Sequence, residues 1–277
     1  RLRSVIFLEF TADVLPGRDD TEGLNRFDAA LLRAQGFLSN DLSHWGVAPQ
    51  AAFAVPRPLF EQCCRYASEQ HVPFSCHAAE SEEEWELFTA GKGRLCDYLA
   101  GRNIPLPERH PDGPLGALIS QGLVPERMVL VHANYLTESS AAYLAGQQVS
   151  VVICPRSHFR FKHGWFTVPQ LIKHGVNVCI GTESLAVTES LDMFEELYCL
   201  KRMAPELSNE TILSMAVTGG ARAAGLAGSV GQLRQGFLAD VIGVELSHAS
   251  GEDVLEELLT EEHEIRLVLV DGKEVIA

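Results

Sequence analysis

Short apolar runs recur along this chain, each followed by a longer amphipathic stretch. That alternation is typical of βα units around a parallel sheet. Continuous Val, Ile and Leu content fits strands that are buried on both faces. The expected strands are Ser4–Glu9, His44–Ala48, Val72–His77, Met128–His132, Val149–Cys154 and Val176–Gly181. Helices are expected between them, as at Arg57–Glu69, Glu82–Ala90 and Thr137–Ala145.

The alternation stops after Leu191, and a smaller β region is expected to follow. Ser208–Gly219 predicts a helix with Ser208 as its cap, because a glutamate follows at position 210. Gly231–Glu245 predicts a turn and a strand. An Asp-Gly pair between two apolar runs predicts a closing hairpin, formed by Ile265–Val270 and Lys273–Ile276. His110–Gly116, rich in Pro and Gly, predicts a surface loop.

Charge and composition limit the classes of partner. The 277 residues contain 22 Lys and Arg against 37 Asp and Glu, a net charge of −15. Nucleic acids and anionic membranes need basic surface, so neither is expected, and a small molecule is the expected partner. No apolar run of membrane-spanning length and no signal peptide is seen, which favours the cytoplasm. Cysteines inside apolar runs, such as Cys154 and Cys179, are expected to be reduced core residues.

The chemistry is expected where the strands end, because active sites of parallel βα folds form at the C-terminal ends of strands. Four expected strands are followed by ligand-like side chains: Gln50, His77 with Glu80, His132, and Glu183. One such histidine alone is more often structural. Two imidazoles and two carboxylates together suit a divalent metal ion, since these groups are usual zinc ligands.

Several motifs, in order and spacing, resemble the deaminase and chlorohydrolase branch of the amidohydrolase superfamily. Thr218–Ala223 followed by Gly231–Asp240 resembles the C-terminal signature of that branch. The other motifs are His77-Ala78-Ala79-Glu80, Leu130–Thr137, Ile153–His158 and Gly175–Ser184. The resemblance covers nearly the whole chain.

The resemblance implies an α/β fold, a (βα)₈ TIM-type barrel with a small C-terminal β appendage. Residues 1–225 would hold barrel strands three to eight, and residues 226–277 would belong to a small β-sandwich. The His-x-His pair of the family's first strand does not occur in this sequence. We therefore expect the first two strands to lie on about a hundred residues before Arg1.

The resemblance also assigns roles at the site. It implies His77 as a metal ligand, Glu80 as a proton shuttle and His132 as a contact of the metal or the activated water. Glu183 stands where the family has an aspartate that binds metal and acts as a base. The implied cofactor is one divalent ion, with zinc favoured over iron, manganese or nickel. Substrate contacts are implied for Gln50, Arg156, His158 and His163.

Two positions depart from the family pattern. The extra methylene of Glu183 moves its carboxylate by roughly 1.5 Å, a displacement large enough to affect catalysis. Gln50 replaces a frequent histidine, and its amide can form hydrogen bonds but cannot act as an acid. The segment from Arg156 to His163 has an equally weighted alternative, a polar surface loop.

These patterns favour a metal-dependent hydrolase that deaminates an amino-substituted heterocycle. Dechlorination or amide hydrolysis would use the same groups. A catalytically inactive homologue that serves as a binding or assembly module is the alternative of a different class. A zinc deaminase of the His-x-Glu and Cys-x-x-Cys type is excluded, because the sequence has no Cys-x-x-Cys. The sequence does not determine the oligomeric state, and a homodimer is the default expectation.

Overall fold

The computed structural model describes residues 2–11, 27–33, 42–246, 254–260 and 263–276. The chain divides into two compact units. One comprises residues 4–151 and 163–177, and the other comprises residues 1–3, 152–162 and 178–277. Among the described residues, no helix is both long enough and apolar enough to cross a membrane.

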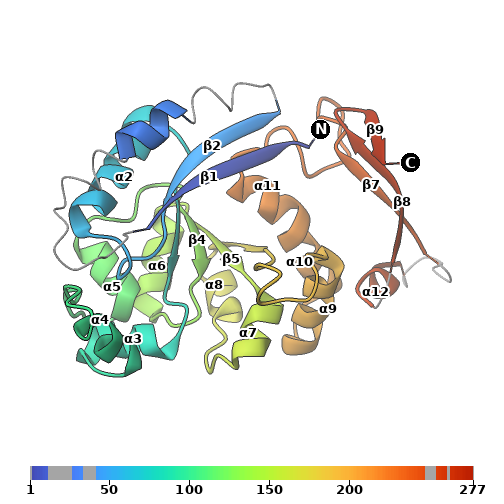
Figure 1. The fold of residues 1–277 in the computed structure, drawn as a ribbon. Helices are drawn as coiled ribbons and strands as arrows, with labels where there is room; N and C mark the ends of the chain where they lie inside the picture. Colours follow the sequence, from blue (N-terminus) through green and yellow to red (C-terminus); the bar gives the residue numbers. More distant parts are fainter. Residues whose placement is uncertain (1, 12–26, 34–41, 247–253, 261–262, 277) are drawn as a thin grey trace. The chain divides into compact units, whose positions relative to one another are not determined.

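The unit that contains residues 4–151 begins with two parallel strands, β1 (Ser4–Phe10) and β2 (Ser43–Pro49). They lie side by side in Figure 1 and pair in register from Ser4 with Ser43 to Phe10 with Pro49. Gly46 is required in β2, because a Cβ there would lie 2.3 Å from the carbonyl oxygen of Pro73. Both strands confirm the prediction from the apolar runs.

The next four predicted strands form one sheet in the order β3-β4-β5-β6. These strands are β3 (Ser75–Ala78), β4 (Val129–His132), β5 (Ser150–Ile153) and β6 (Asn177–Ile180). β3 begins later than predicted, because the Val72 amide donates to the Ala67 carbonyl at the end of the preceding helix. Isolated parallel bridges from Val47 to Phe74 and from Ala51 to His77 continue the pairing from β2 to β3.

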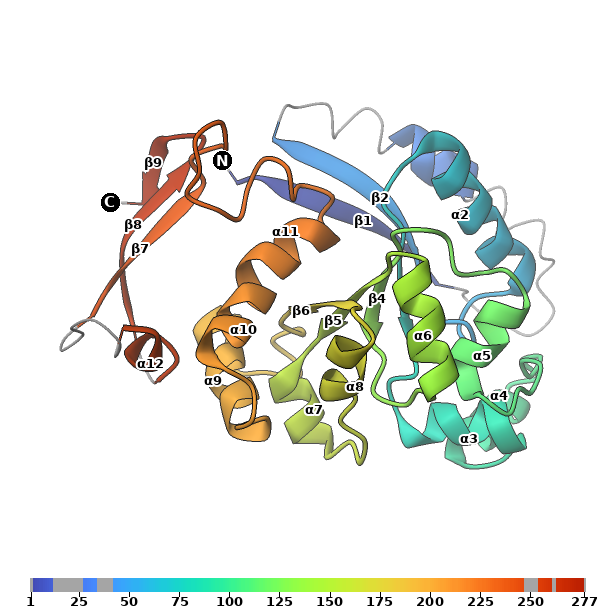
Figure 2. The same ribbon diagram turned by 180° about the vertical axis from the view of Figure 1, so that it is seen from behind.

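Helices alternate with these strands as predicted. Figure 2 shows α6 between α5 and α8. Leu87, Phe88 and Cys96 belong to one buried cluster that packs α3 and α4 together. Residues 27–33 are helical. The other helices described in this unit are α2 (Arg57–Gln70), α3 (Glu82–Ala90), α4 (Arg94–Ala100), α5 (Gly113–Ser120), α6 (Glu138–Gly146) and α8 (Val168–Lys173).

The prediction of a surface loop at His110–Gly116 is wrong for its second half. Gly113 begins α5, and residues 113–118 are buried. Pro114 occupies the first turn of the helix, where a missing amide proton costs nothing. Gly113 lies against the indole of Trp85, since a Cβ there would be 2.3 Å from a ring carbon. Glycine and proline mark a helix start here.

The other unit is helical at first and ends in an antiparallel sheet. Ser208 caps the predicted helix, but the structure divides it into α10 (Asn209–Ser214) and a π-helix (Met215–Gly219). The remaining helices are α7 (Pro155–Phe161), α9 (Met193–Met203), α11 (Gly220–Ala223) and α12 (Val254–Leu258).

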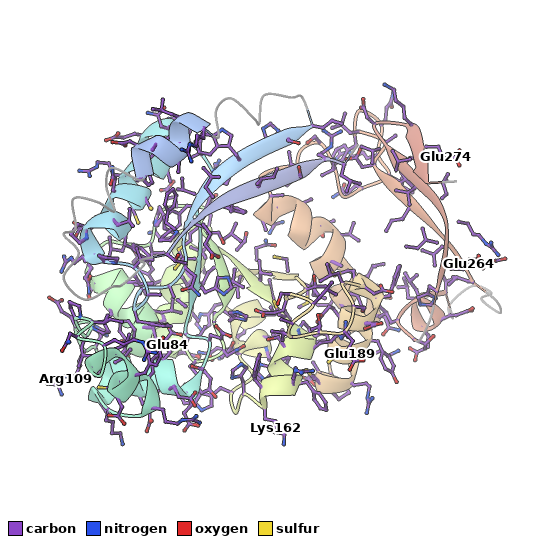
Figure 3. The ribbon with its side chains drawn as sticks, in the orientation of Figure 1. Glu84, Arg109, Lys162, Glu189, Glu264 and Glu274 are labelled. Carbon is purple, nitrogen blue, oxygen red and sulfur yellow. The ribbon has the colours of Figure 1, made fainter. Side chains whose placement is uncertain are left out.

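The terminal sheet has the strand order β7-β8-β9, with β7 at Val241–Glu245, β8 at Glu264–Val270 and β9 at Lys273–Ile276. The predicted hairpin between β8 and β9 is confirmed. Asp271 and Gly272 take positive φ angles of 54° and 71°, which these residue types tolerate in a tight turn. Glu264 and Glu274, labelled in Figure 3, are both exposed.

Candidate metal and catalytic site

Two histidines meet where β3 and β4 end. The strands pair in parallel with Ala78 opposite His132, so His77 and His132 lie on adjacent strands one residue apart in register. His132 Nε2 lies 3.1 Å from His77 Nδ1, and the ring centroids are 5.0 Å apart. The structure therefore brings together the two imidazoles predicted from the strand ends.

The backbone at these strand ends is strained. Ala79, His132 and Ala133 have φ angles of 56°, 76° and 51°, a region that non-glycine residues avoid. Hydrogen bonds hold the two loops together. The Ala133 amide donates to the Ala78 carbonyl at 3.1 Å, and the Tyr135 amide donates to the Ala79 carbonyl at 2.9 Å. Strain of this kind is characteristic of functional sites.

Glu80 follows in the loop after β3. Its Oε2 lies 3.6 Å from His132 Nε2, in an ion pair if the imidazole is protonated. The His132 side chain is 3% exposed and the Glu80 side chain 35% exposed. Glu80 thus lies close to the buried histidine and is partly open to solvent. That position suits proton transfer.

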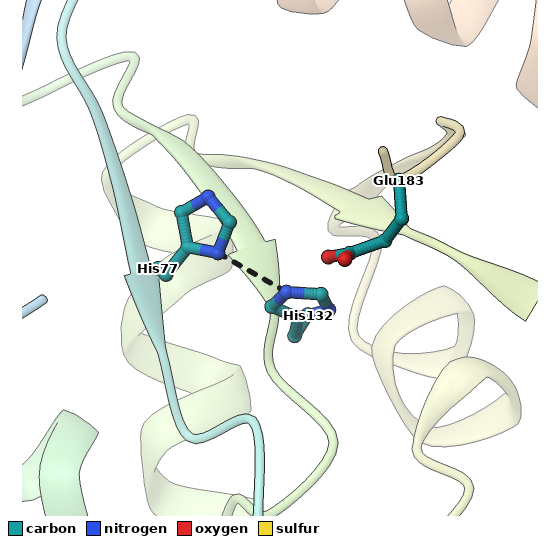
Figure 4. Close-up of side chains that lie close together, drawn as sticks. All are labelled: His77, His132 and Glu183. Atoms are coloured by element: carbon teal, nitrogen blue, oxygen red, sulfur yellow. Dashed lines mark hydrogen bonds between the residues drawn. The ribbon is translucent and has the colours of Figure 1, made fainter. Parts of the chain in front are cut away.

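Glu183, in the loop after β6, supplies the third candidate ligand. One of its carboxylate oxygens and one nitrogen from each of His77 and His132 all lie within 4.8 Å of one another. Figure 4 shows the carboxylate directed towards the His132 ring. Two ligand atoms of a tetrahedral zinc ion are about 3.3 Å apart, so the 3.1 Å between the two imidazole nitrogens fits shared coordination. The donor set and its spacing suit a divalent cation.

Two further residues, neither with a predicted role, hold this loop. Glu84, on α3, accepts a hydrogen bond from the Glu80 amide at 2.8 Å. Asn134 donates from Nδ2 to the Glu80 carbonyl at 2.9 Å. Ser81-Glu82-Glu83-Glu84 has the sequence of a capping box. That signal predicts a backbone contact for Glu84, but it does not predict that the residue is buried.

Gln50 lies beside the site through its backbone. The His77 amide donates to the Gln50 carbonyl at 2.9 Å, and the Gln50 amide donates to the Phe10 carbonyl at 3.0 Å. Its side chain is half-buried. The structure thus places Gln50 next to a candidate ligand, and a substrate contact for its amide stays a prediction.

The other predicted substrate contacts are spread over α7 and the following residues. Arg156 is held by protein groups: its Nη1 lies 3.0 Å from Ser190 Oγ and 2.6 Å from Glu195 Oε2. His158 is half-buried on α7. His163 makes an edge contact with the Tyr135 ring, with centroids 6.2 Å apart. Their substrate roles stay predictions.

Residues 16–275 match the family model described as the amidohydrolase family. The chain belongs to the amidohydrolase family. It falls in the deaminase and chlorohydrolase branch, as the motifs predicted. The chain is 30% identical over 227 residues to a 5-methylthioadenosine/S-adenosylhomocysteine deaminase of Syntrophobacter fumaroxidans, covering 79% of this chain and 47% of that protein. It is 32% identical over 188 residues to an aminodeoxyfutalosine deaminase of Deinococcus radiodurans, covering 65% and 45%.

Solved structures agree with this assignment. An adenosine deaminase of Xanthomonas campestris with bound zinc superposes with a TM-score of 0.79 at 28% identity, over 98% of this chain and 60% of that one. The aminofutalosine deaminase of Helicobacter pylori gives a TM-score of 0.86 at 20% identity, over 99% and 68%, which shows a shared fold. This chain spans about half the length of the curated relatives that it matches.

Proposed function

We propose that this protein is a divalent-metal-dependent hydrolase that removes the amino group from a purine nucleoside. The observation that carries the proposal is the meeting of His77, His132 and Glu183, with Glu80 3.6 Å from His132. Membership of the amidohydrolase family and similarity to nucleoside deaminases support the substrate class.

The three residues would hold the cation through two neutral imidazoles and one carboxylate. A divalent cation in such a set supplies the activation of water at neutral pH. Zinc is favoured, because it is bound in the Xanthomonas campestris relative. Glu183 has a further role in the proposal, as the base that replaces the family's aspartate.

The proton transfers would be made by Glu80. Hydrolytic deamination forms a C–O bond at the ring carbon that bears the amino group, breaks the C–N bond and releases ammonia. A proton must therefore pass from the attacking water to the departing nitrogen. The Glu80 side chain is exposed enough to reach a substrate, and its carboxylate lies close to the buried His132 ring. Where His132 contacts the activated water in place of the cation, its Nε2–H would stabilise the oxygen on which negative charge develops, and His77 and Glu183 would hold the cation.

The first test combines metal analysis with an ammonia-release assay on the full-length natural protein. Adenosine, 5′-deoxyadenosine, 5′-methylthioadenosine and S-adenosylhomocysteine are suitable substrates. We expect about one equivalent of divalent metal and release of ammonia from at least one of the four. His77→Ala should lose both metal and activity, whereas His44→Ala, at an exposed position on β2, should lose neither.

A folded protein that holds no metal and releases no ammonia would instead favour the inactive homologue. The role of Glu183 has its own test. Glu183→Ala should lower the metal content, and an unchanged stoichiometry would reject Glu183 as a ligand. Glu183→Asp, which restores the family's residue, should keep the metal bound.

A further inference from the structure

The start of α3 departs from an ordinary helix cap. Ser81 is the N-cap residue and accepts the Glu84 amide at 3.2 Å. In a capping box, a glutamate at the third helical position returns to the amide of the N-cap residue. Here Oε2 of Glu84 instead accepts the amide of Glu80, one residue before the cap, at 2.8 Å. The glutamate side chain therefore reaches past the helix into the loop after β3.

Glu80 is held from the other side by the loop after β4. Asn134 Nδ2 donates to the Glu80 carbonyl at 2.9 Å. One peptide group on each side of the Glu80 Cα is thus fixed, the first by a side chain of α3 and the second by a side chain that follows β4. The preceding residue, Ala79, has a φ of 56°. The loop adopts a conformation that alanine avoids, so these contacts help to keep it there.

Helix capping alone does not explain the burial of Glu84. The residue is 2% exposed, and its Oε1 is buried with no hydrogen-bond partner among the described residues. Burial raises the pKa of this carboxyl to about 7. A buried carboxylate with an unsatisfied oxygen costs stability. An apolar side chain of similar size would avoid that cost, and Ser81 already caps the helix.

We propose that Glu84 and Asn134 form a backbone clamp that sets the position of the Glu80 carboxylate against His132. They are positioning residues: neither needs to touch the substrate, and each acts through Glu80. The inference rests on the proposed function, in which Glu80 carries the proton. According to the proposal, the rate of deamination depends on Glu84 of α3 and on Asn134 after β4, in addition to Glu80.

The test uses graded variants in the full-length, metal-loaded protein. Glu84→Leu removes the acceptor and replaces it with an apolar side chain of similar size. Glu84→Gln keeps a neutral acceptor and serves as the conservative variant. Displacement of a catalytic group by about 1 Å can cost a factor of 10². We expect Glu84→Leu to lower kcat about 10- to 100-fold with KM and metal content unchanged, and Glu84→Gln to lie between it and the wild type.

Ser81→Ala is the matched control, because it weakens the same helix start without removing the contact to Glu80. It should reduce stability and leave the kcat of the folded enzyme unchanged. A second control is the Glu80→Gln background. If Glu84 acts through Glu80, Glu84→Leu should cause little further loss there. An equal loss in both backgrounds, or an unchanged kcat in Glu84→Leu, would overturn the proposal.

Hydrogen exchange gives a readout that does not require turnover. The Glu80 amide should exchange faster in Glu84→Leu than in the wild type or in Ser81→Ala. If the amide does not respond, the clamp is refuted whatever the activity. If wild-type protein deaminates none of the four nucleosides, the proposed function fails, and faster exchange at Glu80 still supports the clamp. Asn134→Ala repeats both measurements from the opposite side of the loop.

Discussion

The strand ends around His77 and His132 differ from the β7–β9 sheet in how far their charged and polar side chains are buried and in what these side chains contact. In the sheet, Arg266 pairs with Glu245 and Glu264, and all three side chains are more than half exposed. At the strand ends, buried or half-buried groups contact one another and particular backbone amides. The charged groups of the two regions therefore differ in burial and in contact with strained backbone.

The two regions also use positive φ angles differently. In the β8–β9 hairpin they fall on Asp271 and Gly272, residue types suited to a turn. At the strand ends they fall on Ala79, His132 and Ala133. Both turn amides of the hairpin are bonded, that of Asp271 to Asp240 Oδ1 and that of Gly272 to the Ala239 carbonyl. The strand ends place positive φ angles on residue types that avoid them, so they depend more strongly on contacts from neighbouring segments. Substitutions should accordingly have large effects at the strand ends and small effects in the sheet.

The largest effect is expected for Glu80→Gln. The amide cannot carry a proton, so kcat should fall by a factor of about 10² to 10⁴, equivalent to about 3 to 5 kcal/mol of activation free energy. Metal content and thermal stability should stay at wild-type values. Steady-state kinetics with elemental analysis measures both. Glu82→Gln, at an exposed position two residues away, is the control, and turnover retained in Glu80→Gln would remove the proton-transfer role.

A second effect should appear in the pH dependence of stability. The pKa of Glu84 is raised from 4.5 to about 7, mainly by burial, and Glu80 and His132 face it. The folded state holds this proton more tightly than the unfolded chain does. Its contribution therefore favours folding below pH 4.5 and is lost as the pH rises through about 7.

Glu84→Gln should remove that dependence. Compared with the wild type, the variant should become relatively more stable as the pH rises from 5 to 8, by an amount on the order of 3 kcal/mol at most. Urea unfolding at several pH values measures the difference. A difference that does not change with pH would show that Glu84 titrates alike in the folded and unfolded states.

A third prediction concerns the support of Ala133. Thr167 is 7% exposed, and its Oγ1 donates to the Ala133 carbonyl at 2.8 Å. Thr167→Val would leave this buried carbonyl without that donor and should lower the free energy of unfolding by about 1 to 3 kcal/mol. Thr260 makes the same kind of bond, to the Glu257 carbonyl, but is exposed. Thr260→Val should cost less than about 0.5 kcal/mol, and equal losses would contradict the comparison.

The smallest effect is expected for Arg266→Ala in β8. Exposed ion pairs contribute about 0 to 1 kcal/mol and are screened by salt. Denaturant unfolding in low and high salt should show a small loss that shrinks with added salt. The activity of the folded protein should not change. A loss comparable with that of Thr167→Val would show that the sheet depends on this network.

The sequence predicted the features that arise from local pattern. Continuous apolar runs located β1, β2 and β4, and the polar residues that end β3 and β4 identified His77 and His132. Glu84 was not singled out, because its capping-box spacing is shared by many helix starts and burial depends on distant packing. α5 was missed at Gly113 because glycine and proline also open surface loops. The π-helix at Met215–Gly219 has no residue pattern that separates it from an α-helix.

The His77 amide donates to the Gln50 carbonyl. At position 50 the backbone therefore contacts the candidate metal ligand, and the side chain is not needed for that contact. The carbonyl that accepts the His77 amide is a backbone group, so it is present whatever amino acid occupies position 50. Proline would be disfavoured, since the Gln50 amide is also bonded. If the predicted substrate contact of the Gln50 amide holds, exchange of this side chain would alter ligand preference and leave the backbone bond to the His77 amide in place.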